Sequence, residues 1–166
     1  MYLCRKNSVM IQRIQSVFLL LASLFVAPLF FLPVADFWGD ISYRLTIYSF
    51  GDLSPDAVSP FSANFTLPIL LFVVVLTLLP FLAIFLYKKR RFQLRLVRVV
   101  LGLALAFLVL IFFYYIPMIE KTVDLSANYV SAKGMFAPVV ALIFLVLAQR
   151  FILKDEKLIR SMDRIR

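Results

Sequence analysis

Two carboxylates just after the first apolar run have the spacing that best suits chemistry. Asp36 and Asp40 flank Trp38 and Gly39. Paired carboxylates can act as acid and base or hold a divalent cation. Nothing nearby supplies a nucleophile or a third ligand, and the same residue types are typical of a solvated, turn-forming loop. The sequence therefore favours the loop, and we expect no catalytic, cofactor-binding or metal-binding residues.

The reactive residue types that the sequence lacks exclude several common kinds of catalytic and metal site. Histidine is absent, and Cys4 is the single cysteine. The common zinc and haem sites, and the Ser-His and Cys-His catalytic designs, need at least one of these residue types, so only carboxylates, lysine, serine or tyrosine are left. A lone cysteine also excludes an intrachain disulfide. We therefore expect no enzyme activity and no cofactor.

Membrane helices are the elements that would position any site. Hydrophobic residues make up 63% of the 166 residues, whereas a soluble domain has about half. A helix needs about 20 apolar residues to cross a bilayer. Four runs approach that length, at residues 17–35, 67–87, 99–117 and 134–153. The predicted fold class is an all-α membrane protein, a single domain over residues 1–166 with four transmembrane helices in an up-down-up-down bundle.

The cations predict how this bundle is oriented. Of the 18 Lys and Arg residues, all but Arg44, Lys121 and Lys133 lie near the N-terminus, in the connector 88–98 or after residue 149. Cytoplasmic connections carry the excess of Lys and Arg. Both termini, the connector and the tail 154–166 are therefore expected in the cytoplasm, and the connections 36–66 and 118–133 outside it.

The connector 88–98 is expected to contact anionic lipids. The formal charge of +9 does not indicate nucleic acid, because the cations sit at the ends of apolar runs and not on a soluble face. Cations at this position attract the anionic lipids of the cytoplasmic leaflet. The connector merges into the third helix, and the predicted lipid contacts are Lys88, Lys89, Arg90, Arg91, Arg95 and Arg98.

The first apolar run could also be a signal peptide. A positive segment before an apolar run is the signature of one, but cleavage after Ala35 would place Pro33 where a small residue is wanted. We expect an uncleaved helix that Pro28 bends, because proline removes a backbone hydrogen bond. Whether Met1 or Met10 is the natural start is open.

A strand is expected in the first outer connection. The segment Ile41–Phe50 is rich in β-branched and aromatic residues, and Ile41, Tyr43, Leu45 and Ile47 alternate onto one face. Glycine and aspartate at both ends predict turns. We expect a small strand or hairpin over the membrane surface.

Small residues predict where helices approach closely. Gly102 with Ala106 forms a small-xxx-small pair, a spacing that lets helix backbones meet in lipid. The fourth run has a similar stripe, formed by Ala137, Ala141 and Ala148.

Ser23 and Thr77 are the mid-span hydroxyls. We expect each to bond back to its own helix. With no ionisable group at mid-span, a transport pathway lacks its usual polar residues.

A pairing between the two ends of the chain is also predicted. Leu158, Met162 and Ile165 recur at helical spacing, so residues 154–166 are expected to form an amphipathic helix. The first and fourth helices of such a bundle are neighbours. Arg13 should then lie at the depth of Asp155 and Glu156 and pair with one of them; the alternative is that Arg13 contacts lipid phosphate.

Three stretches resemble a family of short bacterial membrane proteins known only as a domain of unknown function. They are the opening Met10 to Gln15 (Met-Ile-Gln-Arg-Ile-Gln), the basic connector from Lys89 to Leu96, and the tail from Lys154 to Arg166. The resemblance covers nearly the whole chain from Met10 and implies four inner-membrane spans with no established activity.

The sequence thus favours a structural or accessory subunit, or an assembly scaffold, of the bacterial inner membrane. The alternative is a small oligomeric transporter or membrane-embedded enzyme. Expected partners are membrane lipids and either a membrane protein or further copies of the chain, without nucleic acid.

Overall fold

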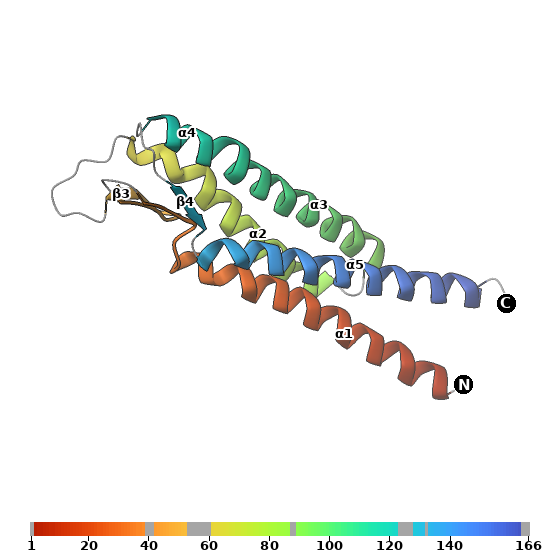
Figure 1. The fold of residues 1–166 in the computed structure, drawn as a ribbon. Helices are drawn as coiled ribbons and strands as arrows, with labels where there is room; N and C mark the ends of the chain where they lie inside the picture. The colour runs from red at the N-terminus through yellow and green to blue at the C-terminus, as the bar shows by residue number, and fades with distance from the viewer. Residues whose placement is uncertain are drawn as a thin grey trace.

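In the described part of the chain, four long helical stretches lie side by side with a small sheet at one end (Figure 1). The computed structural model describes the backbone of residues 2–38, 42–52, 61–86, 89–122, 128–131 and 133–163. Side chains are described for residues 14–38, 42–51, 61–62, 64–86, 89, 91–122 and 133–156.

The first and second helices differ in how proline affects them. Helix α1 covers Tyr2–Val26 and tightens into the 3-10 segment η1, Ala27–Phe30. Pro28 lies in η1, where the α-helical pattern ends. Helix α2 covers Leu67–Phe85 after the 3-10 segment η2, Ala63–Thr66, and continues through Pro80.

The third helical stretch is longer than expected. Helix α3 covers Arg90–Val109, continues as the π-helical segment η4, Leu110–Tyr115, and ends as α4, Ile116–Thr122. The run 99–117 was expected to end at Pro117, but the helix passes through this residue. The wider π turn changes the phase of the helix, so that the neighbours Tyr115 and Ile116 are both buried.

The fourth helical stretch joins the expected span and tail. The 3-10 segment η5, Lys133–Met135, leads into α5, Phe136–Asp163. The tail expected at 154–166 is therefore a continuation of the helix as far as Asp163. Side chains beyond Glu156, including the predicted apolar face of the tail, lie outside the described residues.

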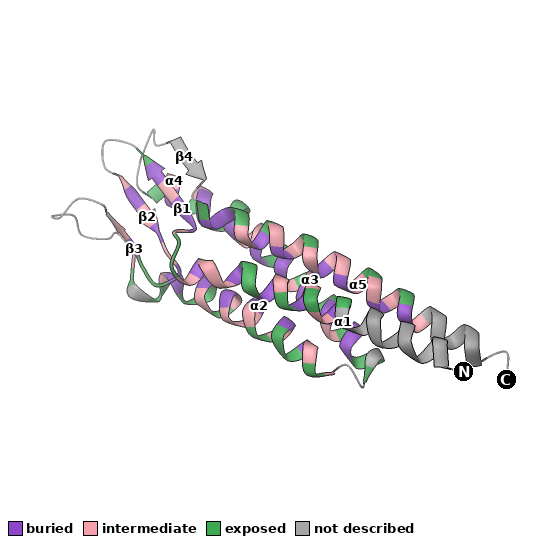
Figure 2. Ribbon diagram, turned by 90° about the horizontal axis from the view of Figure 1, so that it is seen from below, coloured by how far each residue is buried: buried purple, intermediate pink, exposed green. Residues whose placement is uncertain are grey.

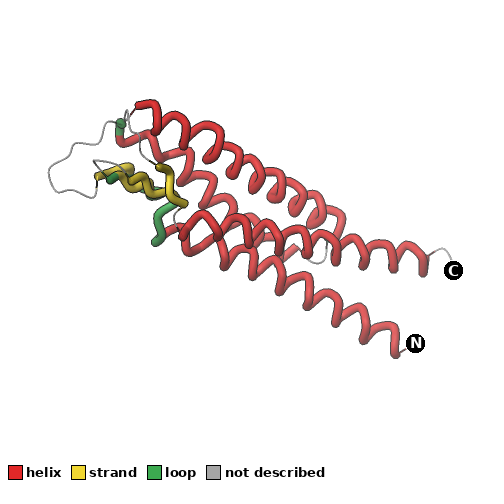
Figure 3. The backbone as a smooth tube through the Cα atoms, in the orientation of Figure 1, coloured by secondary structure: helices red, strands yellow, loops and turns green. Residues whose placement is uncertain are grey.

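Each helical stretch packs against two others. Helix α1 contacts α2 and α5, and α3 contacts the same two helices. The chain direction alternates, and the starting end of α1 and the final end of α5 lie away from the sheet (Figures 1 and 3). Buried and exposed positions alternate along the helices (Figure 2). Aliphatic and aromatic residues, such as Leu19, Val73, Phe107 and Leu145, fill the core.

Three described helical stretches are long and apolar enough to cross a membrane, and a fourth apolar one is shorter. The three are Asn64–Phe85, Arg91–Thr122 and Lys133–Glu156. The shorter one is Ile14–Phe30. The expected span 17–35 was wrong at its outer end, because Ala35 belongs to a strand.

The sheet is larger than the expected hairpin. Its strands are β1 (Ala35–Trp38), β2 (Tyr43–Leu45), β3 (Phe50–Asp52) and β4 (Asn128–Ser131). They are antiparallel in the order β3-β2-β1-β4. Because β4 comes from the connection 118–133 and β1 from the first connection, their pairing joins both connections into one sheet. Of the four residues predicted to share one face, Tyr43, Leu45 and Ile47 are all buried, and Ile41 lies outside the described residues.

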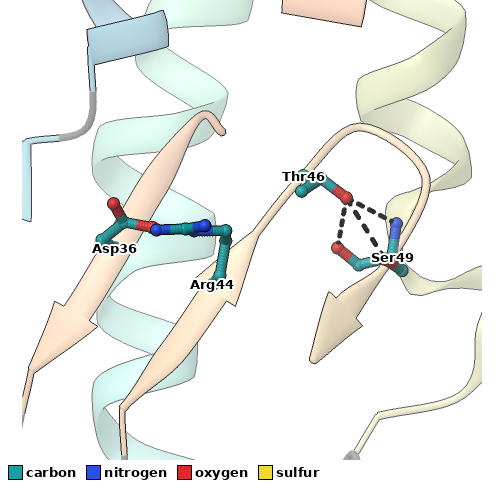
Figure 4. Close-up of polar contacts among 4 residues, drawn as sticks. All are labelled: Asp36, Arg44, Thr46 and Ser49. Carbon is teal, nitrogen blue, oxygen red and sulfur yellow. Dashed lines mark hydrogen bonds and ion pairs between the residues drawn. The ribbon is translucent and has the colours of Figure 1, made fainter. Parts of the chain in front are cut away.

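A turn divides the expected strand 41–50. The Thr46 backbone N–H donates to the Ser49 main-chain oxygen at 2.9 Å. The Thr46 hydroxyl accepts from the Ser49 N–H at 3.0 Å and donates to the Ser49 carbonyl at 2.9 Å (Figure 4). Hydroxyl side chains that bond nearby backbone groups in this way stabilise turns without glycine.

Candidate functional site

The seam between α1 and α5 contains a buried amide at the end of the bundle away from the sheet. Gln15 is 4% exposed, and its Nε2 donates to the main-chain oxygen of Phe151 at 3.2 Å. Phe18 stacks on Phe151 with ring centroids 5.2 Å apart. Farther along the seam, Phe25 stacks on Phe144, also at 5.2 Å. The seam thus joins one buried hydrogen bond to a ladder of aromatic rings.

Asp155 lies one turn beyond Phe151 and is 3% exposed. The helices are antiparallel, so one turn toward the start of α1 corresponds in depth to one turn toward the end of α5. Arg13 lies two residues before Gln15, on the part of α1 that is level with this turn of α5. The side chain of Arg13 lies outside the described residues, and its pairing with Asp155 or Glu156 stays a prediction.

A second buried amide fixes the junction of α2 and α3. Gln93 is 1% exposed, and its Nε2 donates to the Ala83 main-chain oxygen at 3.0 Å. Ala83 lies in the last turn of α2, where carbonyl oxygens lose their regular helical partners. Gln93 therefore caps α2 from within α3 and sets the rotation of α3 about its axis.

The cations of the connector lie on the surface where they are described. The exposed ones are Lys89, Arg91, Arg95 and Arg98. Side chains of Lys88 and Arg90 lie outside the described residues. Among described residues the ion pair found is Arg44 with Asp36, so no described carboxylate pairs with the four exposed cations.

The mid-span hydroxyls are both bonded to main-chain oxygens. Thr77 Oγ1 donates to Val73 one turn earlier at 2.8 Å, as predicted. The prediction for Ser23 was wrong, because its Oγ donates across to the Thr77 main-chain oxygen of α2 at 2.9 Å. A main-chain carbonyl oxygen has two lone pairs, so the Thr77 oxygen can accept from Ser23 of α1 in addition to a partner within its own helix.

An aromatic cluster joins the third helical stretch to the sheet. Tyr115 is 2% exposed, and its hydroxyl donates to the Phe65 main-chain oxygen at 2.8 Å. Phe65 stacks on Phe61 with centroids 4.1 Å apart, and Phe61 meets Phe50 of β3 edge to face at 5.2 Å. Tyr43 of β2 stacks on Phe50 at 5.3 Å. These contacts hold the inner face of the sheet against the bundle.

Asp36, one of the two carboxylates considered for catalysis or metal binding, forms an ion pair with Arg44. The Arg44 Nε lies 2.9 Å from Asp36 Oδ1, across the β1–β2 pair (Figure 4). Asp40 lies outside the described residues. Among the described residues, no three metal-ligating side chains gather. The pair of Asp36 and Arg44 therefore has the geometry of a cross-strand contact.

The predicted small-residue contacts divide into two groups. Ala141 and Ala148 are buried, and Ala137 is partly buried, on α5. Gly102 and Ala106 are exposed on α3, and nothing lies within 4 Å of a Cβ placed on Gly102. The structure therefore gives α3 no helix neighbour at Gly102 among the described residues.

The interhelical amides Gln15 and Gln93 were missed, although the sequence carried a signal for them. Gln15, Leu19, Ala22 and Val26 follow the spacing of one helix face, and all four are buried. Gln93 is likewise the first residue of a buried face, which continues on α3 with Val97, Val100 and Ala104. When a glutamine occupies a position on the apolar face of a helix, and the neighbouring cations lie on the other face, the pattern predicts a buried hydrogen bond from that glutamine.

Comparison with known proteins gives the chain a family and no activity. No curated protein matches the chain. The family model described as "Domain of unknown function (DUF4293)" matches residues 11–165. This match includes α1 from residue 11 onward, the three later helical stretches and the sheet, and the chain belongs to the DUF4293 family of unknown function.

Proposed function

We propose that this chain is a four-span protein of the bacterial inner membrane that serves as a structural or accessory subunit, or as an assembly scaffold. Its membrane character is supported by three long apolar helical stretches and by the shorter apolar stretch Ile14–Phe30. Backbone helix extends α1 back to Tyr2, beyond that apolar stretch. An α1 of this length reaches across a hydrocarbon core of about 30 Å.

The proposed orientation is supported by where the cations fall in the fold. The junction of α2 and α3, the start of α1 and the end of α5 lie at the end of the bundle away from the sheet (Figure 1). These segments hold the cation-rich parts of the sequence. Arg44 lies in the sheet, and Lys121 and Lys133 flank the connection that contributes β4. The rule that cations stay inside then places both termini in the cytoplasm and the sheet outside it.

The observation that carries the scaffold role is that Ser23 and Thr77 are both bonded to the protein backbone. Ser23 links α1 to α2, and Thr77 bonds within α2. Neither hydroxyl is left to line a polar path, which a transporter would need near mid-membrane. The sheet, held by Tyr115 and the aromatic cluster, adds a fixed platform outside the bundle. A rigid, apolar body with an ordered outer platform suits assembly more than alternating access.

Quantitative co-purification from native membranes tests this role. The tagged chain would be extracted in mild detergent, with an unrelated four-span protein carrying the same tag as control. We expect a membrane partner in fixed stoichiometry, and a lower yield of that partner's complex on native gels when the chain is deleted. A chain that purifies only with itself and supports solute flux in liposomes would contradict the proposal and favour the oligomeric transporter.

A further inference from the structure

The start of α3 presents a line of cations on its outer surface. We call Lys89, Arg91, Arg95 and Arg98 the cationic strip; all four are exposed. The three arginines are spaced by four and three residues, which places them on one side of a helix. At a rise of 1.5 Å per residue, the three arginines extend about 10 Å along the helix axis, and Lys89 lies just before the helix begins.

The opposite side of the same turns is fixed inside the bundle. Gln93, Leu94 and Val97 are buried, and the Gln93 amide is bonded to the Ala83 oxygen of α2. Rotating α3 to bring an arginine inward would break this hydrogen bond and expose two apolar side chains. The fold therefore holds the strip outward.

Nothing described neutralises this charge. The strip has no ion pair with a described residue, and the first turn of α3 holds no acidic residue. Phe92 follows Arg91 and Val99 follows Arg98 in sequence, and both are also exposed. The surface thus combines cations that pair with no described residue and exposed apolar side chains, at the point where the apolar span begins.

We propose that the cationic strip binds the phosphate groups of anionic phospholipids in the cytoplasmic leaflet, with acyl chains against Phe92 and Val99. Arginine suits this ligand because its planar guanidinium can donate two parallel hydrogen bonds to one phosphate. The apolar neighbours favour a lipid over a soluble polyanion, which has no acyl chain to place beside them. This inference rests on the proposed membrane placement of α3.

Native mass spectrometry of the full chain tests the strip directly. The protein in zwitterionic detergent would be titrated with phosphatidylglycerol or phosphatidylcholine, and bound lipid counted. Wild type should prefer phosphatidylglycerol. The double variant Arg95→Gln/Arg98→Gln should bind it about tenfold or more weakly, since each cation near a charged membrane surface adds to lipid affinity. The matched double variant Lys121→Gln/Lys133→Gln, which removes the same charge from exposed residues near the sheet, should bind as wild type does.

Further measurements distinguish lipid binding from binding of other anions, and loss of charge from loss of packing. Arg95→Lys/Arg98→Lys keeps the charge and should retain most of the preference, which shows that loss in the glutamine variant is not a packing effect. Equal weakening in both glutamine pairs, or no weakening in either, would overturn the inference. Tighter binding of a polyglutamate peptide than of phosphatidylglycerol would also overturn it, because the occupant would then be an acidic protein segment. None of these outcomes depends on which way the chain crosses a bilayer, so failure here is distinguishable from failure of the proposed topology.

Discussion

Gln15 of α1 and Phe151 of α5 are joined by a hydrogen bond from the amide Nε2 to the main-chain oxygen, 3.2 Å apart. The contact ties the start of the chain to its last helix across 136 residues. A buried amide of this kind specifies which faces of two apolar helices meet, because any other rotation would leave it without a partner.

Replacing Gln15 with leucine should therefore loosen the seam of α1 and α5. We expect the free energy of unfolding in detergent to fall by about 0.5–1.5 kcal/mol, the usual net contribution of one hydrogen bond. Gln149→Leu, at a partly buried position with no described hydrogen bond, is the control and should cause no loss. Thermal unfolding in detergent measures both, and equal behaviour of the two variants would contradict the role given to Gln15.

Gly134 should tolerate no side chain. A Cβ at this residue would lie 2.2 Å from the main-chain oxygen of Pro33, so the start of α5 or the turn after α1 must move. We expect Gly134→Ala to destabilise by roughly 1–3 kcal/mol, the usual cost of overpacking. Gly102→Ala meets open space and should be neutral or stabilise by up to about 1 kcal/mol, because alanine favours helix. If the two alanine variants lose the same stability, the close approach at Pro33 is wrong.

The two neighbouring tyrosines should respond differently to loss of the hydroxyl. Tyr115→Phe removes the hydrogen bond to Phe65, and we expect the free energy of unfolding to fall by about 1 kcal/mol and the connections that carry the sheet to be proteolysed faster. Tyr114 is 54% exposed and has no described hydrogen bond, so Tyr114→Phe should change neither measurement. Limited proteolysis of the protein in detergent, together with thermal unfolding, compares the two variants. Release of the sheet by Tyr114→Phe would contradict the tie through Tyr115.

The predicted pairing of Arg13 with Asp155 or Glu156 requires a charge-swap cycle. Arg13→Glu alone, and Asp155→Arg with Glu156→Arg, should each lower the unfolding temperature, because each leaves like charges near one another. The combined variant should recover at least half of the larger loss. Strictly additive losses would show that Arg13 has a separate role, such as contact with lipid phosphate.

Much of the helical framework follows from apolar runs. Helix α2 begins at Leu67, where the second run was predicted to start, because a charge-free segment of that length has few alternatives to helix in lipid. The end of the first span was harder to predict, because apolar residues near Ala35 suit both a membrane span and a strand that packs on a helical bundle. Pro28 and Pro33 decide the outcome by disfavouring helix, and the alternation of burial in β1 follows.

The sheet and the interhelical bonds were only partly predictable. A hydroxyl turn between Thr46 and Ser49 divides a segment whose composition indicates one strand. Strand β4 is four residues long and depends on pairing with β1, a partner nearly 100 residues away in sequence. The partner of Ser23 depends on the neighbouring helix, which sequence periodicity cannot identify. Local sequence patterns thus cannot predict contacts that depend on which elements pair in the fold. They can predict which residues of a helix face the core, because that depends only on helical periodicity.

Side-specific cysteine labelling in intact cells tests the central claim, a four-span chain with its sheet outside the cytoplasm, most directly. In a Cys4→Ser background, single cysteines would replace the exposed residues Ser49, between β2 and β3, and Arg91, at the start of α3. An impermeant maleimide should label the Ser49→Cys variant in intact cells, and the Arg91→Cys variant only after the membrane is opened. Labelling of Arg91→Cys but not Ser49→Cys in intact cells would invert the topology, and labelling of both would contradict the four-span account.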